Sequence, residues 1–161
     1  MNGVEQQAVI SGPSLSRWKV SSTSVCGSSH EKLGTPCQDA SFWSVQENNI
    51  FFAAVADGAG SASRSDVGAQ IASQTAVEAL KTETNLENRL LKNPRTFKTV
   101  LVKALKSALR AVKEEAKTQG IKPRELASTL IVVIATSKVV ATAQIGDGAA
   151  VIQTQNNELI A

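Results

Sequence analysis

Aromatic and sulfur-containing side chains are scarce in this sequence, which has no tyrosine, two tryptophans, four phenylalanines and two cysteines. Apolar runs are far shorter than the roughly 20 residues that cross a bilayer, and residues 1–13 lack the features of a secretory signal. We therefore expect a soluble cytoplasmic protein without a membrane partner, in which Cys26 and Cys37 are reduced thiols. With His30 and Asp39 they form a possible zinc set, but the spacing matches no standard zinc finger.

Proline is also rare, with four residues, while 42% of the chain is hydrophobic and 19% is charged. This composition is typical of a folded domain and not of a disordered chain. A length of 161 residues suits one domain with a real core. Residues 1–16 are polar and lack a periodic pattern, so we expect a loose N-terminal tail followed by one domain over residues 17–161.

Basic residues exceed acidic ones only slightly, since 17 against 14 gives a formal net charge of +3. Much of the excess lies between Lys92 and Lys117, on a predicted helix without interleaved aromatic residues that could stack on bases. This pattern favours a solvated helical face over a nucleic-acid site. We therefore expect no nucleic-acid partner.

The stretch from Phe51 to Gly60 organises the chain. It begins as a short apolar run typical of a buried strand, and it ends in a single acid, Asp57. Burying a lone carboxylate costs several kcal/mol unless a hydrogen bond or a cation compensates it. Asp57 and the carbonyl of Gly58 are suitable ligands for Mg²⁺ or Mn²⁺, but an Asp-Gly pair is also a common hairpin turn. Both interpretations stay open at this point.

Three runs with strand-like composition precede the first predicted helix. Residues 17–26 predict a strand, a second run begins at Phe42, and after a turn a third covers residues 50–56. The turn residues between the last two runs indicate an antiparallel hairpin. Such a hairpin places Asp39 and Asp57 at the same end of two paired strands, where they could share a metal ion.

Two helices follow. The first is predicted over residues 66–82, with Ser65 or Asp66 as its N-cap. The second lies between Pro94 and Gly120 and is wide enough on its apolar side to cover a sheet. Its predicted core stripe consists of Phe97, Val100, Leu101, Ala104, Leu105, Ala108, Leu109 and Val112.

The last third of the chain is again strand-like. Residues 128–135 are almost uninterrupted β-branched sequence and predict a central strand buried on both faces. A further strand at 139–145 ends in Gly146-Asp147-Gly148, where Asp147 is either a ligand or a hairpin-turn residue. The chain then resumes at 149–154, turns, and starts another apolar segment at Leu159.

Four motifs, in this order and spacing, resemble the PP2C-type (PPM) metal-dependent protein phosphatases, and in particular the N-terminal portion of the domain in the bacterial branch. That branch has a Ser-His pair, a short loop and then Pro-Cys-Gln-Asp. The motifs are Ser29-His30 with Pro36-Cys37-Gln38-Asp39-Ala40, Val55-Ala56-Asp57-Gly58-Ala59-Gly60, Ser128-Thr129-Leu130, and Gly146-Asp147-Gly148.

The resemblance implies an α+β fold, a sandwich of antiparallel sheets flanked by helices, with a binuclear Mn²⁺ or Mg²⁺ centre that hydrolyses phosphorylated proteins through a metal-activated water. Carried over by position, Asp57 resembles the carboxylate that bridges both metals, and Gly58 resembles the residue that ligates through its carbonyl. Asp39 resembles the acid that holds metal through bound water, and Asp147 resembles an acid that helps to bind a third metal. No catalytic side chain is implied beyond these ligands.

The sequence departs from the family pattern at three places. Ala59 stands where many members have a histidine that is a proposed proton donor. The loop before Asp39 offers only His30 and Lys32 where a phosphate-binding arginine is frequent, and His30 is as easily a loop histidine with ordinary hydrogen bonds. Family domains also continue further and supply more aspartates, so the domain looks truncated. We therefore expect weak metal binding and little activity of this chain alone.

Two other functions are considered. The chain could be a non-catalytic phosphatase-like module that binds a protein partner, and completeness of the metal site separates that hypothesis from the enzyme. Alternatively, residues 58–66 could bind an anion at a helix N-terminus. That segment lacks the Gly-Lys-Ser/Thr ending of a P-loop, and its Ser63 and Arg64 are typical of a solvated loop.

Overall fold

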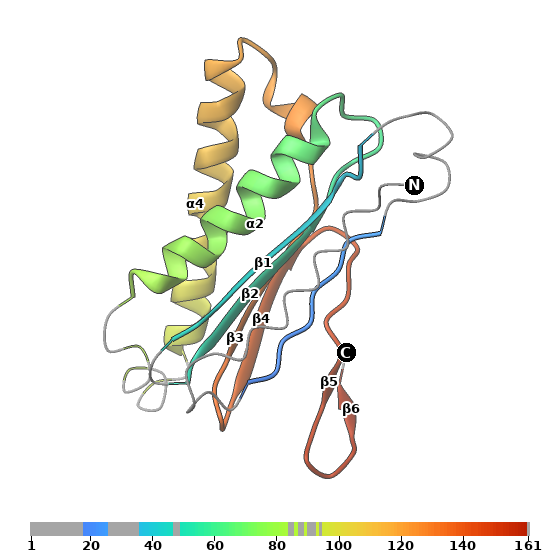
Figure 1. Cartoon of the computed structure of the whole chain (residues 1–161). Coiled ribbons are helices and arrows are strands. Elements are labelled where there is room, and N and C mark those ends of the chain that lie inside the picture. The colour runs from blue at the N-terminus through green and yellow to red at the C-terminus, as the bar shows by residue number, and fades with distance from the viewer. Residues whose placement is uncertain are drawn as a thin grey trace.

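The computed structural model describes residues 18–25, 36–46, 49–83, 86, 89, 93 and 95–160. The fold is α+β, as predicted, with a four-stranded antiparallel sheet and two long helices on one of its faces (Figure 1). The predicted tail at residues 1–16 lies outside the described residues. No helix of the described part is long and apolar enough to cross a membrane.

The sheet consists of β1 (Asp39–Val45), β2 (Phe51–Asp57), β3 (Leu130–Ala135) and β4 (Val140–Ile145). The strands lie in the order β1-β2-β3-β4, and each is antiparallel to its neighbour. The predicted hairpin between β1 and β2 is therefore confirmed. The predicted central position of β3 is also confirmed, because it pairs with β2 on one side and β4 on the other.

In the sequence the two helices lie between β2 and β3, and in the structure both cover the same face of the sheet (Figure 1). They are α2 (Ser65–Lys81) and α4 (Arg95–Thr118), and the short 3-10 helix η1 (Pro123–Leu126) leads from α4 towards β3. Gly120, two residues beyond the end of α4, has a positive φ of 67°, the left-handed conformation that follows many helices. The predicted positions of both helices are confirmed.

The core lies between the sheet and the helices. Phe52, Ala54 and Ala56 of β2 are buried on the helix side, and alternating residues of β3 are buried with them. The opposite face of the sheet is less covered: Val55 is 51% exposed, and Ile131 is only half-buried. The expectation that both faces of β3 are buried is therefore wrong for the described residues, because helices cover only one face.

Two smaller predictions about the helices are also wrong. Leu109, placed in the core stripe, is 52% exposed, because it lies at the edge of the apolar side of α4. Neither Ser65 nor Asp66 is the N-cap of α2. That position is Arg64, with no side-chain capping bond, and Ser65 is already the first helical residue, fully buried.

The segment 18–25 is not a strand, contrary to the prediction. It runs along the sheet face opposite the helices (Figure 1) and is held there by side chains. The Trp18 ring stacks on Phe51 with centroids 5.4 Å apart, and its Nε1 donates to the Asn49 carbonyl at 2.7 Å. Serine-rich sequence provides hydroxyls that bond locally, and this competes with a regular ladder.

The C-terminal hairpin is predicted in the right place but is shorter than expected. Its strands β5 (Ile152–Gln153) and β6 (Leu159–Ile160) form a two-stranded antiparallel ribbon. The turn contains Asn157 with a positive φ of 62°, and the Thr154 amide donates to the Glu158 carbonyl at 2.8 Å. This ribbon is the second sheet of the described chain.

Candidate metal centre

The β1–β2 hairpin places two acids directly opposite each other. Asp39, the first residue of β1, pairs in register with Asp57, the last residue of β2. At the next position of the ladder, the Gly58 amide donates a hydrogen bond to the Gln38 carbonyl at 3.1 Å. Asp39 and Asp57 are therefore a non-hydrogen-bonded pair, the kind in which Cα atoms approach to about 4.5 Å. The predicted meeting of these two acids is confirmed.

Both acids lie on the face of the sheet away from the helices. Since residues alternate between faces along a strand, Asp57 is exposed, whereas Ala56 beside it is buried. The premise that Asp57 is a buried carboxylate is therefore wrong. Instead, Asp39 and Asp57 form a pair of exposed like charges. Like charges that face each other across two paired strands destabilise a sheet.

A cavity of about 230 Å³ adjoins this pair. Its walls come from β1, β2 and the irregular segment 18–25, and both acids line it. At about 30 Å³ for each water molecule, the space suits an ion together with part of its hydration shell. The lining residues are Thr23, Ser24, Val25, Asp39, Ala40, Ser41, Val55, Ala56 and Asp57.

Gly58 is packed so closely that no other residue fits without movement. A Cβ atom there would lie 2.7 Å from the Gln38 carbonyl oxygen and 2.8 Å from the Ser65 Cβ. The following amide, that of Ala59, donates to the Ala127 carbonyl at 2.9 Å. The backbone that carries Asp57 is thus held between β1, the start of α2 and the residues before β3.

Thr129 holds the same backbone from the β3 side. Its amide donates to the Asp57 carbonyl at 2.7 Å, and its hydroxyl accepts a hydrogen bond from the Asp57 amide at 2.9 Å. In the sequence this threonine belongs to a family motif, and no role was predicted for it. A hydroxyl residue immediately before a strand was the available signal.

Asp147 follows β4 at the same end of the sheet as the two paired acids. Ile145 pairs with Leu130 at the start of β3, and a Cβ on Gly146 would lie 2.6 Å from the Thr129 methyl carbon. Asp147 is exposed, and among the described residues no group of three or more His, Cys, Asp or Glu is placed to hold a metal ion. Its proposed ligand role remains a prediction.

Several predicted residues fall outside the described part of the chain. His30, the candidate phosphate-binding residue, is among them. Lys32 is another, and so is Cys26, which belongs to the possible zinc set. Cys37 is described, and it is a free, half-buried thiol within hydrogen-bonding distance of the Ser24 hydroxyl. Zinc binding by these residues stays untested.

The loop between Gly58 and α2 is tied to η1. Glu125 accepts a hydrogen bond from the Ser63 hydroxyl at 2.9 Å, and its carbonyl accepts one from the Arg64 amide at 2.9 Å. The bond from Ser63, with a smaller effect of Arg124, holds the pKa of Glu125 below its usual range. Ser63 and Arg64 are exposed, as predicted, but their loop is anchored.

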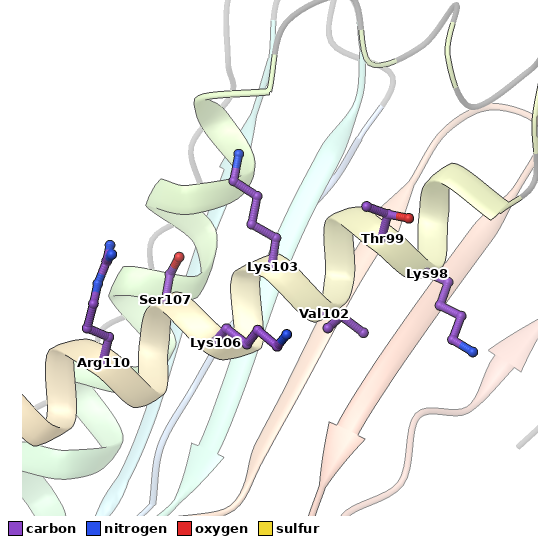
Figure 2. Close-up of a pocket in the computed structure, with 7 residues that line it drawn as sticks. All are labelled: Lys98, Thr99, Val102, Lys103, Lys106, Ser107 and Arg110. Carbon is purple, nitrogen blue, oxygen red and sulfur yellow. The ribbon is translucent and has the colours of Figure 1, made fainter.

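A further surface depression, of about 760 Å³, lies on the outer side of α4 (Figure 2). Long cationic side chains, with no aromatic residue among them, form its walls. These cationic side chains are exposed, which agrees with the predicted solvated helical face. The lining residues are Lys98, Thr99, Val102, Lys103, Lys106, Ser107 and Arg110.

A comparison with protein-family models tests the family resemblance. The model for protein phosphatase 2C matches residues 26–161. The chain belongs to the protein phosphatase 2C family. A search of curated proteins finds no match.

The acid pair fits the divalent ions that the protein phosphatase 2C family generally uses. Mg²⁺ and Mn²⁺ prefer carboxylate, carbonyl and water oxygens. Asp39 and Asp57 supply two opposed carboxylates beside an open cavity. These carboxylates are donors of the kind that hard cations prefer, and no third His, Cys, Asp or Glu of the described residues joins them.

Proposed function

We propose that this chain forms part of a metal-dependent serine/threonine protein phosphatase that hydrolyses phosphate monoesters of proteins. The observation that carries the proposal is the register pair Asp39 and Asp57, two like charges facing each other beside a cavity. A bound cation would remove the repulsion between them. Cation binding therefore explains why two carboxylates face each other in a member of a phosphatase family.

In this proposal, Asp39 and Asp57 hold the divalent ions, Mn²⁺ or Mg²⁺, together with the Gly58 carbonyl. A divalent ion held there would lower the pKa of a coordinated water and neutralise charge on a phosphoryl group. The chain's own residues orient these ligands through the bonds to Gln38 and Thr129. Ala59 has no proton to donate, so the leaving group must take its proton from another source.

The described residues bring together two carboxylates and no third His, Cys, Asp or Glu. Octahedral Mg²⁺ sites with few carboxylates bind weakly unless a substrate phosphate adds ligands. We therefore expect weak metal binding and low activity from this chain by itself. The second candidate function, a non-catalytic module that binds a protein, is supported by the same observation.

Hydrolysis of a chromogenic aryl phosphate, measured with and without Mn²⁺, tests the proposal. The test variant is Asp57→Asn, and the matched control is Glu78→Gln, an exposed acid of α2 that pairs with Lys81. Mn²⁺-dependent hydrolysis that Asp57→Asn abolishes and Glu78→Gln preserves supports the phosphatase. Hydrolysis unaffected by Asp57→Asn contradicts it.

If the wild-type chain shows no measurable hydrolysis, Mn²⁺ binding decides between the hypotheses. Binding is measured by electron paramagnetic resonance of the free ion. Binding that Asp57→Asn weakens and Glu78→Gln preserves supports the metal site at the acid pair. Binding that both variants retain in full contradicts that site and favours the protein-binding module.

A further inference from the structure

Thr129 bonds the Asp57 backbone in an unusual way. In a regular antiparallel pair, two opposed residues exchange amide-to-carbonyl bonds in both directions. Here the Thr129 amide donates to the Asp57 carbonyl at 2.7 Å, but the Asp57 amide donates to the Thr129 hydroxyl at 2.9 Å. The continuous β2–β3 ladder ends two positions earlier, at Val55 and Ile131, and an isolated bridge between Gly58 and Ser128 follows in the same register. A side chain therefore holds the end of β2 where a backbone carbonyl normally would.

The methyl group of the same threonine is also fixed. Gly146 has a φ of +101°, and a Cβ on it would lie 2.6 Å from the Thr129 Cγ2 atom. The methyl thus fills the space over this glycine. Because a β-branched side chain has few χ1 rotamers, a seated methyl determines where the hydroxyl points. The hydroxyl is held towards the Asp57 amide.

We propose that Thr129 is a positioning residue for the metal centre, and that its hydroxyl sets the orientation of Asp57. This inference rests on the proposed function, since it assigns Asp57 to the metal. Thr129 acts through Asp57 and touches neither metal nor substrate. Removing a residue that orients a metal ligand commonly weakens metal affinity by about 10-fold to 100-fold.

Two substitutions separate the hydroxyl from the methyl. Thr129→Val keeps the shape and loses the acceptor, whereas Thr129→Ser keeps the acceptor and loses the methyl. We expect Thr129→Val to weaken Mn²⁺ binding about 10-fold, and Thr129→Ser to weaken it less, because its hydroxyl can still reach the Asp57 amide. In the Asp57→Asn background, Thr129→Val should have no further effect on Mn²⁺ binding.

A second measurement does not depend on metal. Hydrogen exchange of the Asp57 amide, followed by NMR in EDTA, should be faster in Thr129→Val and near wild type in Thr129→Ser, because only valine removes the acceptor. Global unfolding in urea, measured in parallel, shows whether the faster exchange is local. A local effect supports the inference.

The outcomes distinguish the two hypotheses. If Asp57→Asn leaves Mn²⁺ binding unchanged, the proposed metal site is wrong, and a positioning role towards metal is wrong with it. If Asp57→Asn weakens binding while Thr129→Val changes neither binding nor Asp57 exchange, the positioning role alone is overturned. If Thr129→Val lowers only global stability, Thr129 is an ordinary structural residue and the inference is also overturned.

Discussion

Asp39 and Asp57 are cross-strand partners at the last position of the β1–β2 ladder, with both side chains on the open face of the sheet. Two like charges placed directly opposite each other destabilise a sheet. A protein that keeps such a pair gains from it in another way. In a family of phosphatases, binding a cation is the gain that the geometry supports.

The first prediction concerns metal affinity. We expect Mn²⁺ to bind the wild-type chain with a dissociation constant weaker than about 10⁻⁴ M, since two carboxylates and a carbonyl are few protein ligands for a divalent ion. Isothermal titration calorimetry measures it, with Asp57→Asn as the comparison. Tight binding at two sites would show that more ligands are present than the described residues provide.

The second prediction concerns Gly58 and uses Gly60 as its matched control. Gly58→Ala places a Cβ within 2.9 Å of Gln38 and Ser65, so we expect a loss of about 1–3 kcal/mol from overpacking. A Cβ on Gly60 meets nothing within 4 Å, and Gly60→Ala should be neutral or stabilise by about 0.4–1 kcal/mol. Urea denaturation of both variants gives the two values. Equal effects would contradict the close packing at Gly58.

The third prediction concerns Gly68→Ala, whose effect on stability we expect to be opposite to that expected from helix propensity. Gly68 lies within α2, where alanine would normally stabilise by about 1 kcal/mol. A Cβ at Gly68, however, would lie 2.0 Å from the Leu126 carbonyl oxygen of η1, a backbone atom that cannot swing away. We expect Gly68→Ala to destabilise the chain by about 3 kcal/mol. A rise in melting temperature would show that α2 and η1 do not pack in this way.

The fourth prediction is a pH dependence at Glu83. This carboxylate bonds Lys103 at 2.5 Å and Arg89 at 2.8 Å, and its side chain is only 9% exposed. The bonds from Lys103 and then Arg89 hold the pKa of Glu83 below its ordinary value of 4.5. A lowered pKa stabilises the fold above pH 4.5, and this stabilisation is lost as the pH falls through the lower, folded-state value.

We therefore expect Glu83→Gln to cost about 1 kcal/mol at pH 7 and progressively less as the pH falls below 4.5. The control is Glu78→Gln, an exposed acid paired with Lys81 at 3.0 Å, which should cost less at pH 7. Urea denaturation across this pH range measures both. A cost for Glu83→Gln that does not change with pH would mean that the ion pairs are not its source.

Local sequence patterns predicted most of the fold. Apolar residues at helical spacing identified α4 because such a helix must bury one side, and turn residues between two strand-like runs identified the β1–β2 hairpin. That hairpin carried the prediction that Asp39 and Asp57 meet, which the register confirms. The family resemblance rested on motifs in order and was confirmed by the match over residues 26–161.

Other features depend on neighbours that are distant in the sequence, and they were predicted wrongly. The segment 18–25 has strand-like composition, but side-chain bonds to β1 and the turn after it replace a ladder. Leu109 matched the helical period, yet it lies beyond the edge of what the sheet covers. Ser65 looked like a cap, but α2 begins one residue earlier than the chemistry of capping suggested.

The sequence by itself determined the elements, the hairpin and the set of acids, because periodicity, turn residues and motif spacing are local properties of the chain. Only the tertiary structure decided that Asp57 faces an open cavity and that Thr129 holds its backbone, since Thr129 lies 72 residues away along the chain. Helix covering on one face of the sheet selects which side of each strand is buried. That choice places the two acids on the free face, where an ion can reach them.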